Sequence, residues 1–117
     1  MRLAETYLLR AEAYMDNGDM VNAANDINTV RARANAALIT PAEVNIDFIL
    51  DERARELAIE EPRRRTLARL GLLYNRVKAY GPTESANSIK TTNNWLPVPQ
   101  SAIDANRGAV LTQNPGY

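Results

Sequence analysis

The sequence predicts an all-α protein, built as an α-α superhelix of tetratricopeptide-like helical hairpins with an extended, loop-rich C-terminal tail. Across residues 1–80, apolar residues recur at steps of three and four, which is the period of an amphipathic helix. From residue 81 onward glycine, proline, threonine, serine and asparagine dominate, and this period is lost. We therefore expect one domain, in which the loop and tail at 81–117 pack on the helices at 1–80.

The first helical hairpin is predicted at residues 1–35. Apolar residues form one stripe along 3–17 and another along 20–34. Between them, Gly18 can adopt the left-handed conformation that ends a helix, and Asp19 can cap the next helix. A connection this short makes the two helices antiparallel neighbours. The spacing is typical of a tetratricopeptide repeat, although no second copy follows at that repeat's period of about 34 residues. The residues at the key positions of the repeat are Ala11, Tyr14, Gly18, Ala23 and Ile27.

Two further helices are predicted before the tail. The Thr-Pro-Ala-Glu sequence at 40–43 has the pattern of a capping box with proline in the first turn, so a third helix should begin there and run to about residue 60. Pro62 cannot continue this helix as a regular interior residue. A fourth helix should cover about 63–79, and Gly71 weakens its middle.

The tail is predicted to be irregular. Residues 81–94 show no periodicity and are expected to form a loop. The Trp-Leu-Pro-Val-Pro segment at 95–99 should be extended, because a residue that precedes proline is pushed away from the helical region. Residues 100–106 can form one helical turn, and the closing Gln-Asn-Pro-Gly-Tyr is rich in turn-forming residues.

Composition argues against a conventional enzyme. The 117 residues include neither cysteine nor histidine, which removes thiol nucleophiles, the commonest general base and the commonest transition-metal ligand. There is no Gly-rich phosphate loop, nucleophile elbow or cysteine metal pattern, so we expect no catalytic residue, cofactor or metal. Fourteen Lys and Arg residues balance fourteen Asp and Glu residues, so no net charge selects nucleic acid. No apolar run approaches the roughly 18 residues of a spanning helix, and no cleavable signal opens the chain.

Three glutamates, Glu52, Glu56 and Glu60, recur every four residues and share one face of the predicted third helix. They could form a site for a metal or for glycoside hydrolysis, which needs two carboxyl groups flanking the scissile bond. They could instead make salt bridges to arginines on neighbouring helices. We favour salt bridges, because no histidine or second acidic cluster completes a site and a buried carboxylate needs a partner. Arg53 and Arg55 are expected to pair with helix carboxylates or with carbonyls of the tail.

A basic cluster could also carry function, and it consists of Arg63, Arg64, Arg65 and Arg69. The cluster could contact phosphate or nucleic acid, but a neutral chain with few aromatic residues nearby favours a solvated helix start instead.

Several aromatic residues are further candidates, since Trp95 and the five tyrosines could stack on sugar rings. Tyr7 and Tyr14 lie on the packed helical stripes and are expected in the core, and Trp95 is expected to close over the helices as a lid.

Several motifs follow one another in a specific order along the whole chain. Arg-Leu-Ala-Glu-Thr-Tyr-Leu opens it at 2–8, Glu52-Arg53 precedes Glu56-Leu57-Ala58, and Leu-Pro-Val-Pro-Gln at 96–100 precedes the final Gln-Asn-Pro-Gly-Tyr. In this order the chain resembles the C-terminal portion of SusD/RagB-type proteins. It departs from their pattern after Glu60, where only Arg63 and Leu67 match. The residues to which the resemblance gives a structural role are Glu52, Arg53, Glu56, Arg63, Pro97 and Pro99.

The resemblance implies a binding protein rather than an enzyme. Members of that family are outer-membrane lipoproteins of Bacteroidetes that capture glycans or peptides and sit as lids on a SusC-like, TonB-dependent transporter. Their fold is a set of tetratricopeptide-like helical pairs with a variable ligand face. A lipid-bearing cysteine anchors them, and this chain has none, so we expect a fragment of a larger protein. The family's ligand contacts lie largely outside the matched motifs, so the ligand-binding residues stay unknown.

Two other functions are considered. A free-standing helical-repeat adaptor would bind a protein segment in its concave face, but this function leaves the Pro-Val-Pro-Gln and Gln-Asn-Pro-Gly-Tyr segments unexplained. A carboxylate-dependent hydrolase that uses Glu52, Glu56 or Glu60 is a distant third. The expected function is capture of a glycan or oligosaccharide for a surface uptake system.

Overall fold

The computed structural model describes residues 2–117, and every regular element in this range is a helix. The all-α prediction is therefore confirmed, whereas the tetratricopeptide likeness of the first hairpin stays a prediction. The chain divides into two compact units, residues 1–61 and residues 62–117. That these units form one domain also stays a prediction. Within residues 2–117, no helix is both long enough and apolar enough to cross a membrane.

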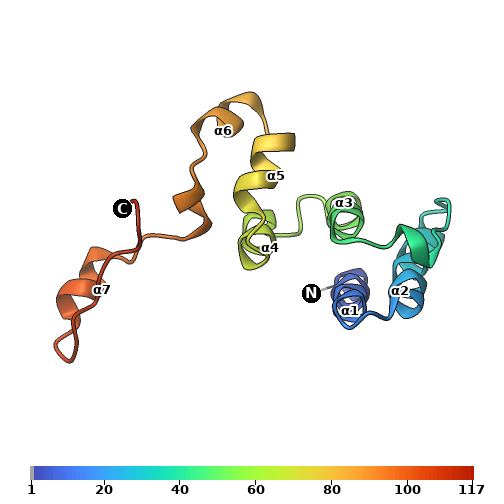
Figure 1. The fold of residues 1–117 in the computed structure, drawn as a ribbon, viewed down its shortest axis with the longest axis horizontal. Coiled ribbons are helices and arrows are strands. Elements are labelled where there is room, and N and C mark those ends of the chain that lie inside the picture. Colours follow the sequence, from blue (N-terminus) through green and yellow to red (C-terminus); the bar gives the residue numbers. More distant parts are fainter. Residues whose placement is uncertain (1) are drawn as a thin grey trace. The chain divides into compact units, whose positions relative to one another are not determined.

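The first unit is a helical hairpin with a third helix packed beside it. Its helix α1 packs against both α2 and α3, with the α1–α2 pair in closest association (Figure 1). A short 3₁₀ helix, η1, lies on α2 and joins it to α3. The bounds are α1 Leu3–Asp16, α2 Met20–Arg33, η1 Pro41–Glu43 and α3 Ile46–Glu56.

The turn between α1 and α2 is set by local chemistry. Gly18 has a φ of +80°, and its N–H donates to the Met15 carbonyl at 3.0 Å. The Asp19 N–H donates to the Tyr14 carbonyl at 2.8 Å, which completes a Schellman motif. The Asp19 side chain then accepts from the Asn22 N–H at 3.1 Å and so caps α2. Both predictions for this turn are confirmed.

The core of the first unit lies between the helices. Small side chains such as Ala11 and Ala23 are fully buried where α1 meets α2, which lets the two backbones approach closely, and larger side chains fill the space around them. Tyr7 and Tyr14, which the sequence places in the core, are half-buried and pack against this cluster. The buried apolar residues of this cluster are Leu8, Ala11, Ala23, Ala24, Ile27, Val30, Ile39, Val44 and Ile49, and Leu50 and Leu57 are also buried.

The predicted third helix is wrong at both ends. The capping box at 40–43 is present, but it starts only the short η1. The backbone then becomes extended, and the Asn45 side chain accepts from the Phe48 N–H at 2.8 Å to cap α3, whereas the predicted cap is Thr40. At the other end α3 stops at Glu56, and Ile59 takes a left-handed φ of +70° that an α-helix cannot contain.

The second unit contains four short helices. Helix α5 packs against α4, α6 and the 3₁₀ helix η2. The predicted helix at 63–79 is wrong, because Gly71, with a φ of +69°, ends α4 in a Schellman motif and α5 begins anew. The predicted loop at 81–94 is also wrong, since it holds α6 and η2. The bounds are α4 Arg63–Arg69, α5 Leu73–Tyr80, α6 Thr83–Ser88, η2 Thr91–Asn94 and α7 Gln100–Ala105.

The extended segment at 95–99 is held by the end of the chain. The Gln113 amide accepts from the Val98 N–H at 2.7 Å and donates to the Val98 carbonyl at 2.9 Å. The Asn114 amide donates to the Leu96 carbonyl at 2.6 Å. Pro97 and Pro99 restrict the backbone on either side of Val98. Both backbone polar groups of Val98 bond to the same side-chain amide, that of Gln113. The tail also contacts the helices of its own unit, since Arg64 donates to the Asn93 carbonyl at 2.8 Å.

We predict that Gly18→Ala lowers the free energy of unfolding by about 1 kcal/mol, because alanine disfavours a positive φ even where space is free. Urea unfolding followed by circular dichroism measures this change. Gly108→Ala is the matched control, since its Cβ also meets open space and its backbone is not left-handed. Equal losses for the two variants would contradict this explanation of the turn.

A second prediction concerns pH. The backbone N–H and side chain of Asn22 lower the pKa of Asp19, so the cap stabilises the fold above the ordinary carboxyl pKa and is lost as pH falls through the lowered value. We therefore expect Asp19→Ala to lower the melting temperature at pH 7 and to have a progressively smaller effect below about pH 4. Asp16→Ala removes an exposed acid from the opposite end of the same turn and should show no such loss at pH 7. A deficit for Asp19→Ala that is independent of pH would refute the role of its charge.

Candidate functional site

The acidic face of α3 is the first candidate site, and arginines occupy it. Glu52 is buried, and Arg31 of α2 donates to its Oε2 at 2.6 Å. Arg55, one turn along α3, donates to the same oxygen at 2.8 Å. The Phe48 ring lies below both guanidinium groups, with its centroid 5.3 Å from Arg31 and 5.9 Å from Arg55. Glu52 is thus held by two cations from two helices.

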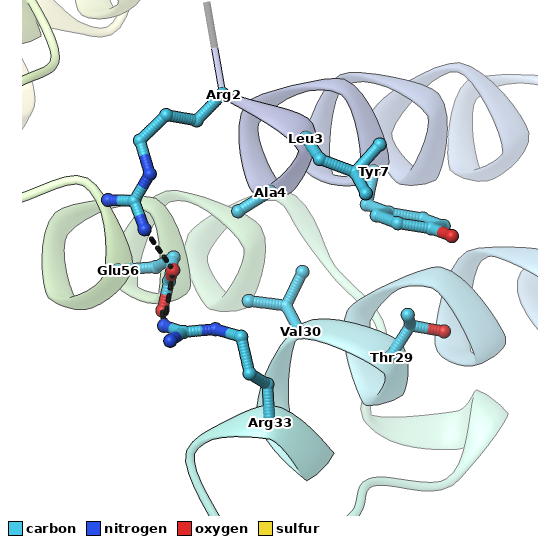
Figure 2. A pocket seen from close by; sticks show the side chains of 8 residues that line it. All are labelled: Arg2, Leu3, Ala4, Tyr7, Thr29, Val30, Arg33 and Glu56. Carbon is cyan, nitrogen blue, oxygen red and sulfur yellow. Dashed lines mark hydrogen bonds and ion pairs between the residues drawn. The ribbon is translucent and has the colours of Figure 1, made fainter.

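Glu56 occupies the same face one turn later. Arg33 of α2 donates to both of its carboxylate oxygens, at 2.6 and 2.7 Å. Arg2 approaches from the start of α1 at 3.5 Å, so Glu56 lies between two guanidinium groups (Figure 2). The other end of the Arg2 guanidinium donates to Glu60 at 2.7 Å. These pairs connect all three helices of the unit.

Arg53 is the most deeply buried ion of the face, with 2% of its side chain exposed. Its Nε donates to Glu61 Oε1 at 2.7 Å, and the Glu61 side chain is 3% exposed. Glu5 of α1 lies 3.9 Å from Arg53 Nη2. The sequence leaves open helix carboxylates or tail carbonyls as partners of Arg53; Glu5 is a helix carboxylate, whereas Glu61 lies between α3 and α4.

A further pair that the sequence does not indicate joins α1 to α2. Arg10 donates to the two oxygens of the buried Asp26 at 2.6 and 2.7 Å. Its guanidinium also lies over the rings of Tyr7 and Tyr14, at 5.3 and 5.8 Å. The bidentate bond with Asp26 raises the pKa of Arg10. The spacing of Arg10 and Asp26 along the chain carries no signal of this contact, which depends on how the hairpin closes.

The chemistry of this face is that of ion pairing. Arginine side chains already bond to the Glu52 and Glu56 carboxylates, so use of either as a general acid would require these bonds to break. Within residues 2–117, no cluster of three or more acidic, histidine or cysteine side chains is arranged to hold a metal ion. The salt bridges are those that the sequence favours over a carboxylate site. That Glu52, Arg53 and Glu56 serve structure alone stays a prediction.

A cavity of about 350 Å³ lies beside this network, between α1 and α2. Its walls are mainly apolar, and the Arg2–Glu56–Arg33 group stands at one end (Figure 2). Leu3 and Tyr7 point into it from α1, and Val30 faces them from α2 (Figure 2). The groove therefore offers an apolar surface and little hydrogen bonding.

A second cavity, of about 690 Å³, lies in the second unit. Three arginines of the basic cluster line it together with Trp95, two features that the sequence presents separately. Trp95 keeps 51% of its surface exposed, so the prediction of a closed lid is wrong. The segment of Trp95 is fixed by backbone hydrogen bonds, which do not require its ring to be covered. The arginines are Arg64, Arg65 and Arg69.

The remaining candidates, Arg63, Pro97 and Pro99, line neither of these two cavities. Arg63 is the first residue of α4 and is half-buried. Pro97 and Pro99 flank the residue that Gln113 holds, as described above. The partners that the sequence does not identify are Arg2, Arg31, Arg33 and Glu61 on the acidic face, and Gln113 and Asn114 in the tail. Only the motif order points to the last two.

These features define a class of protein, an all-helical frame whose charged residues join its helices to one another. Comparison with known proteins gives the family. The family model described as the SusD family matches residues 1–117. The chain is also 37% identical over 119 residues to the starch-binding protein SusD of Bacteroides thetaiotaomicron. The chain therefore belongs to the SusD family, and the resemblance noted in its motifs is confirmed.

The extent of this match limits what it shows. The alignment covers 99% of this chain but 21% of the starch-binding protein, so the chain spans about a fifth of that relative's length. No solved structure matches the chain. The match therefore establishes the family of this segment.

We predict that Arg53→Met lowers the free energy of unfolding by about 3 kcal/mol, because it removes the buried cation that faces Glu61. The double variant Arg53→Met with Glu61→Gln should recover part of this loss, since it no longer buries that carboxylate charge. Urea unfolding of both single variants and the double variant gives the coupling energy between the two residues. Arg107→Met, on an exposed arginine, is the control. Additive losses would show that the pair is not coupled.

Proposed function

We propose that this chain is the C-terminal part of a cell-surface nutrient-binding protein that captures a glycan or oligosaccharide. The observation that carries the proposal is the 37% identity to a protein named as starch-binding, which extends over nearly the whole chain. The family match over residues 1–117 supports the same conclusion. The protein that carries this chain would act at the outer membrane as a lipoprotein and deliver its ligand to a SusC-like, TonB-dependent transporter.

The arrangement of charge supports a binding role rather than an enzymatic one. The carboxylates that could have served glycoside hydrolysis, Glu52, Glu56 and Glu60, all bind arginines within 2.8 Å. A glycoside hydrolase needs two carboxyl groups that flank the scissile bond, and here arginine side chains occupy all three carboxylates. In this proposal the first unit is a rigid helical frame, and the ligand is held without being cleaved.

The proposal is tested on the protein at its full encoded length. We predict that isothermal titration calorimetry with maltoheptaose shows saturable binding and that the recovered sugar is uncleaved by mass spectrometry. Cellohexaose, with the same sugar unit in a different linkage, is the matched ligand control. Release of shorter maltooligosaccharides would contradict the binding role and favour a hydrolase.

The proposed partner needs a separate experiment. Affinity purification of the tagged protein from detergent-solubilised outer membranes should recover a TonB-dependent barrel protein. An absence of glycan binding together with stable capture of a soluble protein would favour the helical-repeat adaptor instead.

A further inference from the structure

The cavity of the second unit is lined by two features that have no part in the charge pairing of the first unit. The basic cluster at the start of α4 and the half-exposed Trp95 are far apart in sequence, but both line the same space of about 690 Å³. This volume lies within the range of about 300–1,000 Å³ that is usual for small-molecule sites. The cavity is therefore large enough for one or two sugar rings.

The lining of this cavity has one sign of charge. Arg64, Arg65 and Arg69 contribute to it, and no Asp or Glu lines it. Asn94 and Asn114 are the uncharged polar side chains of the lining. A guanidinium binds carboxylate, sulfate or phosphate through paired N–H donors. The cavity is thus complementary to an anionic group, although the chain as a whole is neutral.

The cavity also has an apolar surface. Trp95 is 51% exposed and the adjacent Leu96 is 65% exposed, and both line the space. An exposed indole is a large apolar surface to leave in water, and its face suits the apolar side of a pyranose ring. An anion alone would not need this surface.

The backbone around Trp95 is held in place by hydrogen bonds. Arg64 donates to the Asn93 carbonyl at 2.8 Å and to the Trp95 carbonyl at 3.3 Å. The Tyr117 hydroxyl donates to the same Trp95 carbonyl at 3.1 Å. A site whose backbone is already ordered loses less conformational entropy when a ligand binds. Arg64 therefore positions the Trp95 segment, whereas Arg65 lines the cavity and is exposed.

We infer that this cavity binds an oligosaccharide that carries anionic groups, with a sugar ring on Trp95 and its carboxylate or sulfate on Arg65. The inference rests on the proposed glycan-binding function and specifies a ligand class and a location for it. Single-stranded nucleic acid also combines rings with anions. It is disfavoured because the site offers one aromatic side chain, whereas strand binding uses a series of them along a basic groove.

The test uses the protein at its full encoded length and four ligands. Hexagalacturonate supplies carboxylates, a sulfated galactan hexasaccharide supplies sulfates, maltoheptaose is neutral, and a six-nucleotide thymidine strand represents nucleic acid. We expect one of the two acidic sugars to bind, and which one binds identifies the anionic group. Trp95→Ala and Arg65→Met should each weaken that binding about tenfold or more. Raising the salt concentration should also weaken binding of the acidic sugar to the unsubstituted protein.

Controls separate this inference from misfolding and from the proposed function. Trp95→Phe keeps an aromatic ring and should retain binding within a few fold, and Arg107→Met removes an exposed arginine that does not line the cavity. Binding of maltoheptaose without either acidic sugar would overturn this inference and leave the proposed function intact. Failure of all three sugars would overturn both. Binding of the thymidine strand alone, or acidic-sugar binding unaffected by Arg65→Met, would also overturn it.

Discussion

Pairing of buried charge governs the first unit. Burying an ion costs several kcal/mol unless a partner compensates for the lost hydration, so Glu52 and Arg53 can be buried only where the fold brings opposite charges to them. Glu52 is paired with Arg31 of α2, whereas the close partner of Arg53 is Glu61, which follows α3. Apolar packing alone would tolerate small shifts of α3 along the hairpin. The short, directional bonds from Arg31 to Glu52 and from Arg33 to Glu56 do not tolerate such shifts.

The sequence predicts the parts of the fold that depend on neighbouring residues. Helices α1 and α2, the left-handed Gly18 and the Asp19 cap are confirmed, because periodicity and capping are local properties. The break at Gly71 is missed although the residue is visible, since a glycine within an apolar period can either weaken a helix or end it. Helix α6 has few apolar residues to form a stripe, so periodicity could not reveal it.

The candidate sites depend on contacts between residues that are distant in the sequence, and these the sequence does not predict. That Glu52 and Glu56 should meet arginines follows from the cost of burying a carboxylate, but the identity of Arg31 and Arg33 depends on how α2 crosses α3. Trp95 illustrates the same point. Its neighbours in sequence suggest a covered residue, but hydrogen bonds to its backbone hold the segment and leave the ring partly exposed. Contacts of this kind are tertiary and leave no period in the sequence.

The two hydrogen bonds between the Gln113 side chain and the Val98 backbone close a loop that contains α7. One amide satisfies both backbone groups of Val98, so the two ends of this loop are fixed independently of what lies between them. The entropy of closing a loop rises only slowly with its length. The segment from Gln100 to Thr112 can therefore lengthen, shorten or change sequence while its anchor points keep their geometry. Such a loop is a place where relatives can diverge in surface character without rebuilding the other helices of the unit.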